Sequence, residues 1–379
     1  EHFDIHYYPQ EREAAELAGR MAERWYARLS RALNHQFARR QPLVLYASHP
    51  DFEQTNALQG EVGEGTGGAT EILKRRIVMP MAGALAETDH VLGHEIVHAF
   101  QFDITAGGGG PGGGNIPAAI RMPLWFIEGM AEYLTLGPVD AHTAMWMRDA
   151  VQRNKIPDVD DLDDPRYFPY RYGQAFWAYV AGRWGDDMVG RLLKASIRTP
   201  DPEKLVQEVL GIDHKALTAD WHGALREAYA GAIESKQKAA AYGKAIITDR
   251  NGGDLNVGPA LSPDGSQLLF LSEKGMFAIE VFLADARTGE FKRKIVKTAV
   301  DPHFESLEFI RSSGGWAPDS RRFVFAAVHK GRPVLTVLDA ERADIVQEVR
   351  LPELGEIFDP SFAPDGQQVV FSATVGGTL

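Results

Sequence analysis

Two histidines and a glutamate form the sequence pattern with the clearest chemical potential, His94-Glu95-Ile96-Val97-His98. The pattern lies within the run VLGHEIVHAF, which predicts a helix, and residues four apart lie on the same face of a helix. Both imidazoles could therefore reach a single metal ion while Glu95 faces a water molecule on that ion. The chain contains no cysteine, so a metal site here must be built from histidine and carboxylate. Nitrogen and oxygen donors of this kind are typical of zinc sites.

A carboxylate that could complete such a site lies downstream, in the run Leu124-Trp-Phe-Ile-Glu128-Gly-Met-Ala-Glu132-Tyr133. This run predicts a second helix, and the glycine after Glu128 permits two helices to approach closely. Two histidines and one glutamate would leave a fourth position open for water. We therefore expect Glu128 to be the third ligand.

The two runs HEIVH and WFIEGMAEY together resemble the gluzincin metallopeptidases, thermolysin-like and aminopeptidase-like, in which an HExxH helix is followed by a helix with the pattern Glu-Gly-x-Ala. The resemblance covers most of residues 1–235. It implies a thermolysin-like zincin domain, one Zn²⁺ per chain and hydrolysis of peptide bonds. The implied roles are zinc ligation by His94, His98 and Glu128, general-base catalysis by Glu95, and orientation of a ligand imidazole by Glu132.

The separation of His98 and Glu128 departs from the family, because 29 residues intervene and the better-known aminopeptidases have a shorter gap. Much of the extra length is the Gly-rich run 107–115, GGGGPGGGN, which predicts a mobile loop. A lid, an autolysis site and an unselected insertion are all compatible with this composition.

The resemblance also implies a Tyr or His that stabilises the oxyanion of the tetrahedral intermediate. Tyr172, in Tyr170-Arg-Tyr172-Gly-Gln-Ala-Phe, is our first candidate because the run resembles the Tyr-x-x-x-Phe helix start of this superfamily. Tyr170 is the alternative.

A short segment before the predicted metal helix is the candidate substrate-binding strand. In gluzincins an edge strand at this place pairs with the extended substrate, and small residues let the peptide approach. We expect this role for Gly67, Gly68, Ala69 and Thr70. The aminopeptidase signature Gly-x-Met-Glu-Asn is incomplete here, because Gly68-Ala-Thr-Glu71-Ile lacks the Met and the Asn. An endopeptidase is therefore favoured over an aminopeptidase.

Hydrophobic periodicity predicts the elements that must position these residues. Strands are expected at 42–47 and 72–79. Helices are expected at 11–34, 86–103, 124–136, 140–154, 173–184, 186–196, 203–210 and 214–239.

Beyond residue 244 the helical spacing gives way to a repeat. Three Pro-Asp-Gly/Ser turns, at Pro263, Pro318 and Pro364, each precede a short alternating strand. The repeats resemble those of TolB-like β-propellers over about 130 residues. A closed propeller needs at least four blades and about two and a half are present, so we expect further blades beyond Leu379 or their removal.

Composition and charge narrow the classes of partner. The 379 residues are 44% hydrophobic, which predicts a folded chain, and 40 Lys and Arg against 52 Asp and Glu give a net charge of −12. This charge and the lack of a basic block argue against a nucleic-acid or anionic-membrane surface.

No apolar run is long enough for a transmembrane segment. The lack of cysteine and the family resemblances favour an extracytoplasmic bacterial protein, periplasmic or secreted, whose signal peptide is not part of this sequence.

We therefore predict an α+β fold: a gluzincin-like metallopeptidase domain over residues 1–240, followed by an all-β propeller segment over 241–379. The expected partners are a peptide or protein substrate and a protein that binds the propeller. Two alternatives stay open, an inactive zinc-containing scaffold and a zinc hydrolase of a non-peptide substrate.

Overall fold

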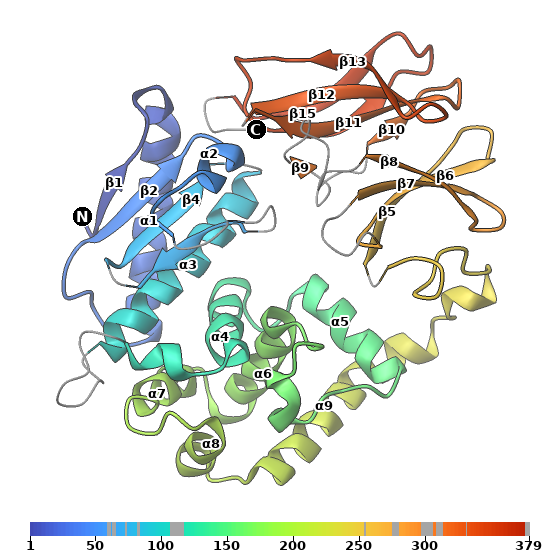
Figure 1. Cartoon of the computed structure of the whole chain (residues 1–379). Coiled ribbons are helices and arrows are strands. Elements are labelled where there is room, and N and C mark those ends of the chain that lie inside the picture. The colour runs from blue at the N-terminus through green and yellow to red at the C-terminus, as the bar shows by residue number, and fades with distance from the viewer. Residues whose placement is uncertain are drawn as a thin grey trace.

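The computed structural model describes residues 1–58, 62, 66–72, 74–81, 84–106, 117–253, 255–274, 280–296, 306–307, 314–330 and 332–375. The first part of the chain is a mixed α+β lobe followed by a lobe of helices, and the last part consists of antiparallel sheets (Figure 1). The fold is therefore α+β, as the sequence predicts. The Gly-rich run 107–115 lies outside the described residues.

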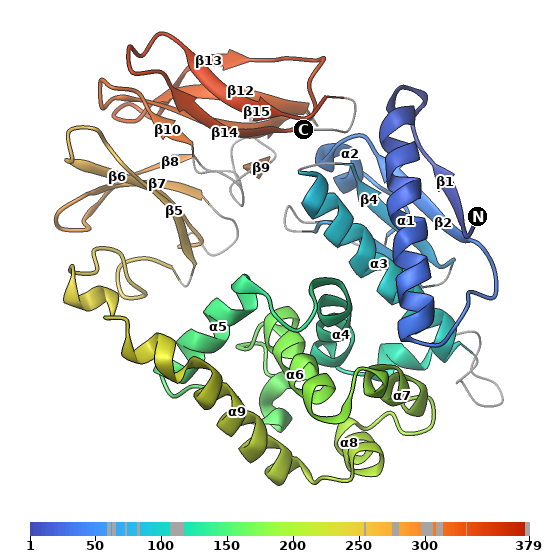
Figure 2. The same cartoon turned by 180° about the vertical axis from the view of Figure 1, so that it is seen from behind.

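The N-terminal lobe is built on a four-stranded sheet in the order β1-β2-β4-β3. β1, β2 and β4 are parallel, and β3 is an antiparallel strand at the edge. Helices α1 and α3 lie side by side against this sheet (Figure 2). The bounds are β1 Phe3–His6, α1 Arg12–Ala32, β2 Gln41–Tyr46, α2 His49–Glu53, β3 Ala69–Glu71, β4 Arg76–Pro80 and α3 Leu85–Thr105, with a 3-10 turn at Pro9–Glu11.

Close packing of α1 on α3 is possible because Gly93 has no side chain. A Cβ atom at Gly93 would lie 2.5 Å from the Trp25 ring. Alternate residues of β2 are buried, so one face of this strand packs into the same core. The core thus fixes the orientation of α3, the helix that carries His94 and His98.

The second lobe contains α4 to α9, and three of these helices begin at an aspartate cap. The side chains of Asp140, Asp201 and Asp213 accept backbone N–H groups in the first turns of α5, α8 and α9. The bounds are α4 Leu124–Leu136, α5 Ala141–Gln152, α6 Pro169–Trp184, α7 Asp187–Ala195, α8 Pro202–Leu210 and α9 His214–Glu234, with 3-10 turns at Ala118–Arg121, Val159–Asp163 and Ala239–Ala241.

Helices α4 and α6 cross at two glycines. A Cβ atom at Gly129 would lie 2.4 Å from the Gly173 backbone, and one at Gly173 would lie 2.3 Å from the Trp125 carbonyl oxygen. The close approach expected from the glycine after Glu128 is therefore present, and α6 is the partner helix. This contact brings the N-terminal end of α6 to the part of α4 that carries Glu128.

The described C-terminal strands form a four-stranded antiparallel sheet, a five-stranded one and a hairpin. The orders are β5-β6-β7-β8 and β10-β11-β12-β13, with β9 also paired to β11, and β14 pairs with β15. The third residue of each Pro-Asp-Gly/Ser turn, Gly265, Ser320 or Gly366, has a positive φ, which explains the glycine preference there. The bounds are β5 Asn256–Leu261, β6 Gln267–Ser272, β7 Glu280–Asp285, β8 Phe291–Val296, β9 Ser306–Leu307, β10 Gly315–Trp316, β11 Arg322–His329, β12 Arg332–Asp339, β13 Asp344–Val349, β14 Ile357–Phe362 and β15 Val369–Ala373.

Among the described residues, the apolar cores of the two parts are separate. One cluster of buried side chains extends from Phe3 to Leu225, and the remaining clusters lie among the C-terminal strands. The expected domain boundary at residue 240 lies between the end of α9 at Glu234 and the start of β5. None of the helices in the described ranges combines the length and apolar character that a membrane crossing requires.

Several predicted boundaries differ from the structure. The strand expected at 72–79 begins only at Arg76, because Arg75 adopts a left-handed conformation with φ 53°. The helix expected from residue 173 begins at Pro169, whose fixed φ suits the first turn of a helix. The last helix ends at Glu234 rather than at 239, and β1 was not predicted.

Candidate metal centre and active site

Three side chains from two helices converge on one point. His94 and His98 lie one turn apart on α3, and Glu128 faces them from α4. The two Nε2 atoms are 3.0 Å apart, and Glu128 Oε2 lies 3.0 Å from His94 Nε2 and 3.1 Å from His98 Nε2. Tetrahedral ligands at zinc bond lengths lie about 3.3 Å apart, so the donor set has the dimensions of a zinc site.

In each imidazole, the hydrogen bond made by Nδ1 determines which group Nε2 directs at Glu128. His94 Nδ1 lies 2.9 Å from Glu132 Oε1, and His98 Nδ1 lies 2.8 Å from Gln101 Oε1. The Gln101 amide is oriented by the hydrogen bond from its Nε2 to the carbonyl of Ile127, so its oxygen faces His98. Both Nδ1 atoms therefore donate, which leaves both Nε2 atoms facing the Glu128 carboxylate. A cation at this point, or a proton on Nε2, would balance the charge of that carboxylate.

The carboxylates around the two imidazoles shift the pKa values of the whole group. Burial disfavours a charged imidazole, but the hydrogen bonds to Glu128 and Glu132 outweigh it and raise the pKa of His94 to about 10. The pKa of His98 is also raised, because the charge of Glu128 outweighs burial. Burial alone would raise the pKa of Glu128, yet the two imidazoles hold it well below its usual range. The surrounding carboxylates thus favour positive charge at the two imidazoles.

Glu132 lies behind His94, in the place that the family resemblance implies. It is 2% exposed, and its other contacts are with His90 Nε2 at 3.2 Å and with Arg171 Nη1 at 2.8 Å. Burial would raise the pKa of Glu132, but hydrogen bonds from His90 and His94 lower it to about 2. His94, His90 and Glu132 form a second group with metal-ligand geometry, although Arg171 already neutralises this carboxylate.

Glu95, the expected general base, is buried beside His94 and His98. The hydroxyl of Thr70 lies 2.7 Å from Glu95 Oε2 and 2.9 Å from the Glu95 carbonyl oxygen. A Cβ atom at Gly68 would lie 3.1 Å from Glu95 Cγ, so the segment before β3 packs directly on this side chain. The expected substrate segment therefore lies at the candidate site, with Ala69 and Thr70 in the edge strand β3 and Gly67 and Gly68 just before it.

The structure separates the two tyrosine candidates, which lie two residues apart on α6. The Tyr170 ring stacks on His94 at 5.7 Å between centroids and 18° between planes. Burial and the charges of Glu128 and Glu95 raise the pKa of its phenol. Tyr172 instead packs against Tyr167 and Trp146. The ring beside the donor set is therefore that of Tyr170, the alternative candidate, and not that of Tyr172, our first candidate.

An aromatic series continues from the site toward the surface. Tyr170 stacks on Phe168 at 5.1 Å, and Phe168 lies 5.7 Å from Trp146. Phe168 is 42% exposed. One wall beside the candidate site is therefore apolar.

Three residues that support the site were not predicted. His90 precedes His94 by one helical turn, and this spacing in HVLGHEIVH is the signal that could have identified it. Gln101 follows His98 by three residues on the same face. Arg171 has no comparable local signal, because only the packing of α6 on α4 places it near Glu132.

Comparison with known proteins provides one family match and several weak structural similarities. The solved structures include TolB from Acinetobacter baumannii, with TM-score 0.27, 21% identity and coverage of 34% of this chain and 29% of that one. The β-propeller domain of the Trilobed protease from Pyrococcus furiosus has TM-score 0.23 and 19% identity, with 31% and 33% covered. The chain thus spans about a third of these structures. No curated protein matches significantly. Residues 72–221, which include every residue of the donor set, match the model of the family described as peptidase of plants and bacteria, BSP.

Proposed function

We propose that this chain is a zinc-dependent peptidase with His94, His98 and Glu128 as the metal ligands. The convergence of two Nε2 atoms and one carboxylate on a single point is the observation that carries the proposal. The match of residues 72–221 to a peptidase family supports peptide bonds as the substrate class. When bound, zinc would polarise the scissile carbonyl and make water a better nucleophile.

Glu95 and Tyr170 are the residues proposed to act on the reacting atoms. Glu95 would take a proton from the attacking water and pass it to the leaving amine. The Tyr170 phenol, whose raised pKa keeps it protonated at neutral pH, would donate a hydrogen bond to the oxyanion. Backbone groups of the edge strand β3 would pair with the extended substrate.

One contact favours internal cleavage over removal of N-terminal residues. Glu71 corresponds to the glutamate with which the aminopeptidases among the gluzincins bind the substrate amine. Its Oε2 accepts the backbone N–H of Lys74 at 2.9 Å and lies 3.4 Å from Arg76 Nε. A carboxylate engaged in this way is poorly placed to bind a free amine, so we propose an endopeptidase.

The substitution Glu95→Gln tests the proposed mechanism. Turnover of a peptide substrate should fall by at least about a hundredfold because the amide cannot accept a proton. Zinc content, measured on the same preparation, should stay at one ion per chain. Glu87→Gln, an exposed change in the first turn of α3, serves as the matched control. Undiminished turnover in Glu95→Gln would reject Glu95 as the base.

A further inference from the structure

A buried carboxylate connects the C-terminal sheets to the N-terminal lobe. Glu356 is 4% exposed and directly precedes β14, and the backbone N–H of His49 donates to its Oε1 over 2.6 Å. Two hydrogen bonds hold Glu356 itself: its N–H donates to Thr374 Oγ1 at 2.8 Å, and the N–H of Thr374 donates to its carbonyl at 3.0 Å. The hairpin of β14 and β15 therefore sets the position of this carboxylate.

The His49 side chain extends the connection into the lobe. Its Nε2 lies 3.0 Å from the carbonyl oxygen of Thr66, and its Nδ1 lies 3.4 Å from Glu53 Oε1. Burial would lower the pKa of this imidazole, but the hydrogen bond to Glu53 and the charge of Glu356 raise it. With acceptors at both ring nitrogens, the imidazole donates in two directions and fixes the Thr66 carbonyl.

Thr66 lies only a few residues before Thr70, whose hydroxyl contacts Glu95. The intervening glycines are tightly packed: a Cβ atom at Gly67 would lie 3.0 Å from Val91, and one at Gly68 would lie 3.3 Å from Met79 Cβ. A displacement of Thr66 would therefore be transmitted to β3 and to the hydroxyl on Glu95.

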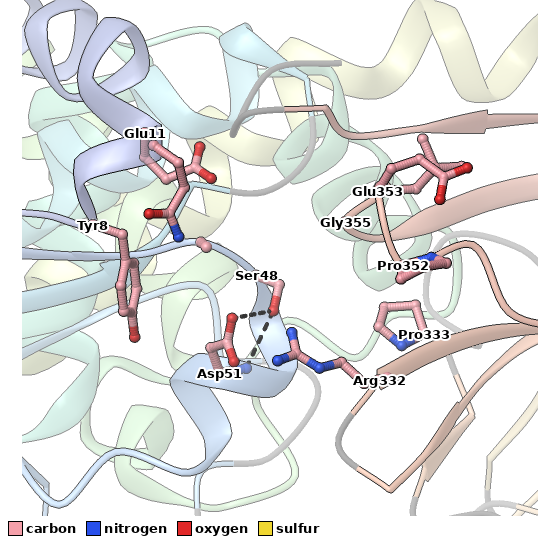
Figure 3. Close-up of a pocket in the computed structure, with 12 residues that line it drawn as sticks. Tyr8, Glu11, Ser48, Asp51, Arg332, Pro333, Pro352, Glu353 and Gly355 are labelled. Carbon is pink, nitrogen blue, oxygen red and sulfur yellow. Dashed lines mark hydrogen bonds between the residues drawn. The ribbon is translucent and has the colours of Figure 1, made fainter.

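The surroundings of the Glu356–His49 contact are polar. A pocket of about 340 Å³ lies between the two parts of the chain, lined by Tyr8, Ser48 and Asp51 from the N-terminal lobe and by Arg332 and Glu353 from the C-terminal sheets (Figure 3). Ser48, the residue before His49, donates to Asp51 at 3.0 Å on the wall of this pocket. Because this junction is open and polar, the buried hydrogen bond from His49 to Glu356 does much to fix the position of the two parts relative to each other.

We propose that Glu356 and His49 are positioning residues, through which the C-terminal sheets hold the segment 66–70 and thereby the carboxylate of Glu95. This inference rests on the proposed function for its catalytic consequence, but its structural consequence is independent. The C-terminal sheets would then contribute to turnover without touching the substrate.

The test uses the full chain loaded with zinc and compares Glu356→Ala and His49→Ala with Glu353→Ala, an exposed change in the same junction. Hydrogen–deuterium exchange over residues 66–72 should rise about fivefold or more in the first two variants and stay unchanged in the third. With labelled casein as substrate, kcat should fall about tenfold in the same two variants at unchanged zinc content. Glu356→Gln should restore both values, because its amide oxygen can still accept the His49 N–H.

The two readouts separate this inference from the proposed function. Increased exchange in the two alanine variants, with a wild-type chain that cleaves no peptide, would support the connection and reject the peptidase. Normal exchange and normal kcat in an active enzyme would overturn the connection. A lowered thermal midpoint in Glu356→Ala without increased exchange over residues 66–72 would assign Glu356 a purely structural role and would also overturn the connection.

Discussion

Tyr170 lies against one face of His94 and beside Glu128, where a phenol can reach an oxyanion. Tyr170→Phe removes only the hydroxyl, so kcat should fall about ten- to a hundredfold while KM changes little. Tyr172→Phe is the matched control and should leave kcat within about twofold. Steady-state kinetics on one peptide substrate measures both. A larger loss in Tyr172→Phe than in Tyr170→Phe would contradict the assignment.

The raised histidine pKa values predict how metal binding depends on pH. With no metal bound, a pKa of about 10 keeps the His94 imidazole doubly protonated and positively charged at pH 7.5, and the pKa of His98 is raised as well. Zinc must displace these protons, so its affinity should fall as the pH falls, about tenfold per pH unit for each proton. Calorimetric titrations in buffers of different ionisation enthalpy should show release of about one to two protons per zinc. No proton release at pH 7.5 would contradict the charge state derived for the site.

At the residue scale, the sequence identifies the donor set better than its surroundings. The four-residue spacing of His94 and His98 is enough to place both imidazoles on one face of a helix. The choice between Tyr170 and Tyr172 depends on the rotation of α6, because residues two apart point about 200° away from each other. That rotation is set by packing against α4, which the sequence does not encode locally.

At the element scale, the α4–α6 crossing should tolerate no side chain. Gly173→Ala would place a Cβ atom 2.3 Å from the Trp125 carbonyl, so the helices must separate. We expect a loss of about 1–3 kcal/mol in the free energy of unfolding, measured by urea denaturation. Activity should fall as well, since Tyr170 lies on the same helix.

Gly182→Ala, also in α6, is the control for that substitution. A Cβ atom there would meet nothing within 4 Å, so alanine should stabilise the helix by up to about 1 kcal/mol. Equal effects of the two substitutions would show that helix propensity, rather than the crossing, determines the result.

Helices and repeated strands were the elements most readily predicted. The range 124–136 agrees with α4 at both ends, and the Pro-Asp-Gly/Ser turns identify the strands β6, β11 and β15. β1 was missed because it is four residues long and gains its place by parallel pairing with β2, a long-range contact. Left-handed Arg75 shortens the predicted strand at 72–79, and arginine gives no advance sign of that conformation.

For the molecule as a whole, the sequence predicts two parts of the chain but not the contact between them. The repeat spacing predicts the C-terminal antiparallel sheets, and the helical periodicity predicts the lobes that precede those sheets. The contact between Glu356 and His49 joins residues 307 apart in the chain, and neither lies in a recognisable pattern. Such a junction depends on the complete fold, which is why the polar pocket beside it could not be foreseen.

Metal analysis of the purified chain shows whether α3 and α4 together build one zinc site. We expect one zinc per wild-type chain and its loss in both His98→Ala and Glu128→Ala. Retention of zinc in these two variants would place the metal at the alternative group of His90, His94 and Glu132 or elsewhere. That result, or a wild-type chain that binds no zinc at micromolar metal, would contradict the proposed site.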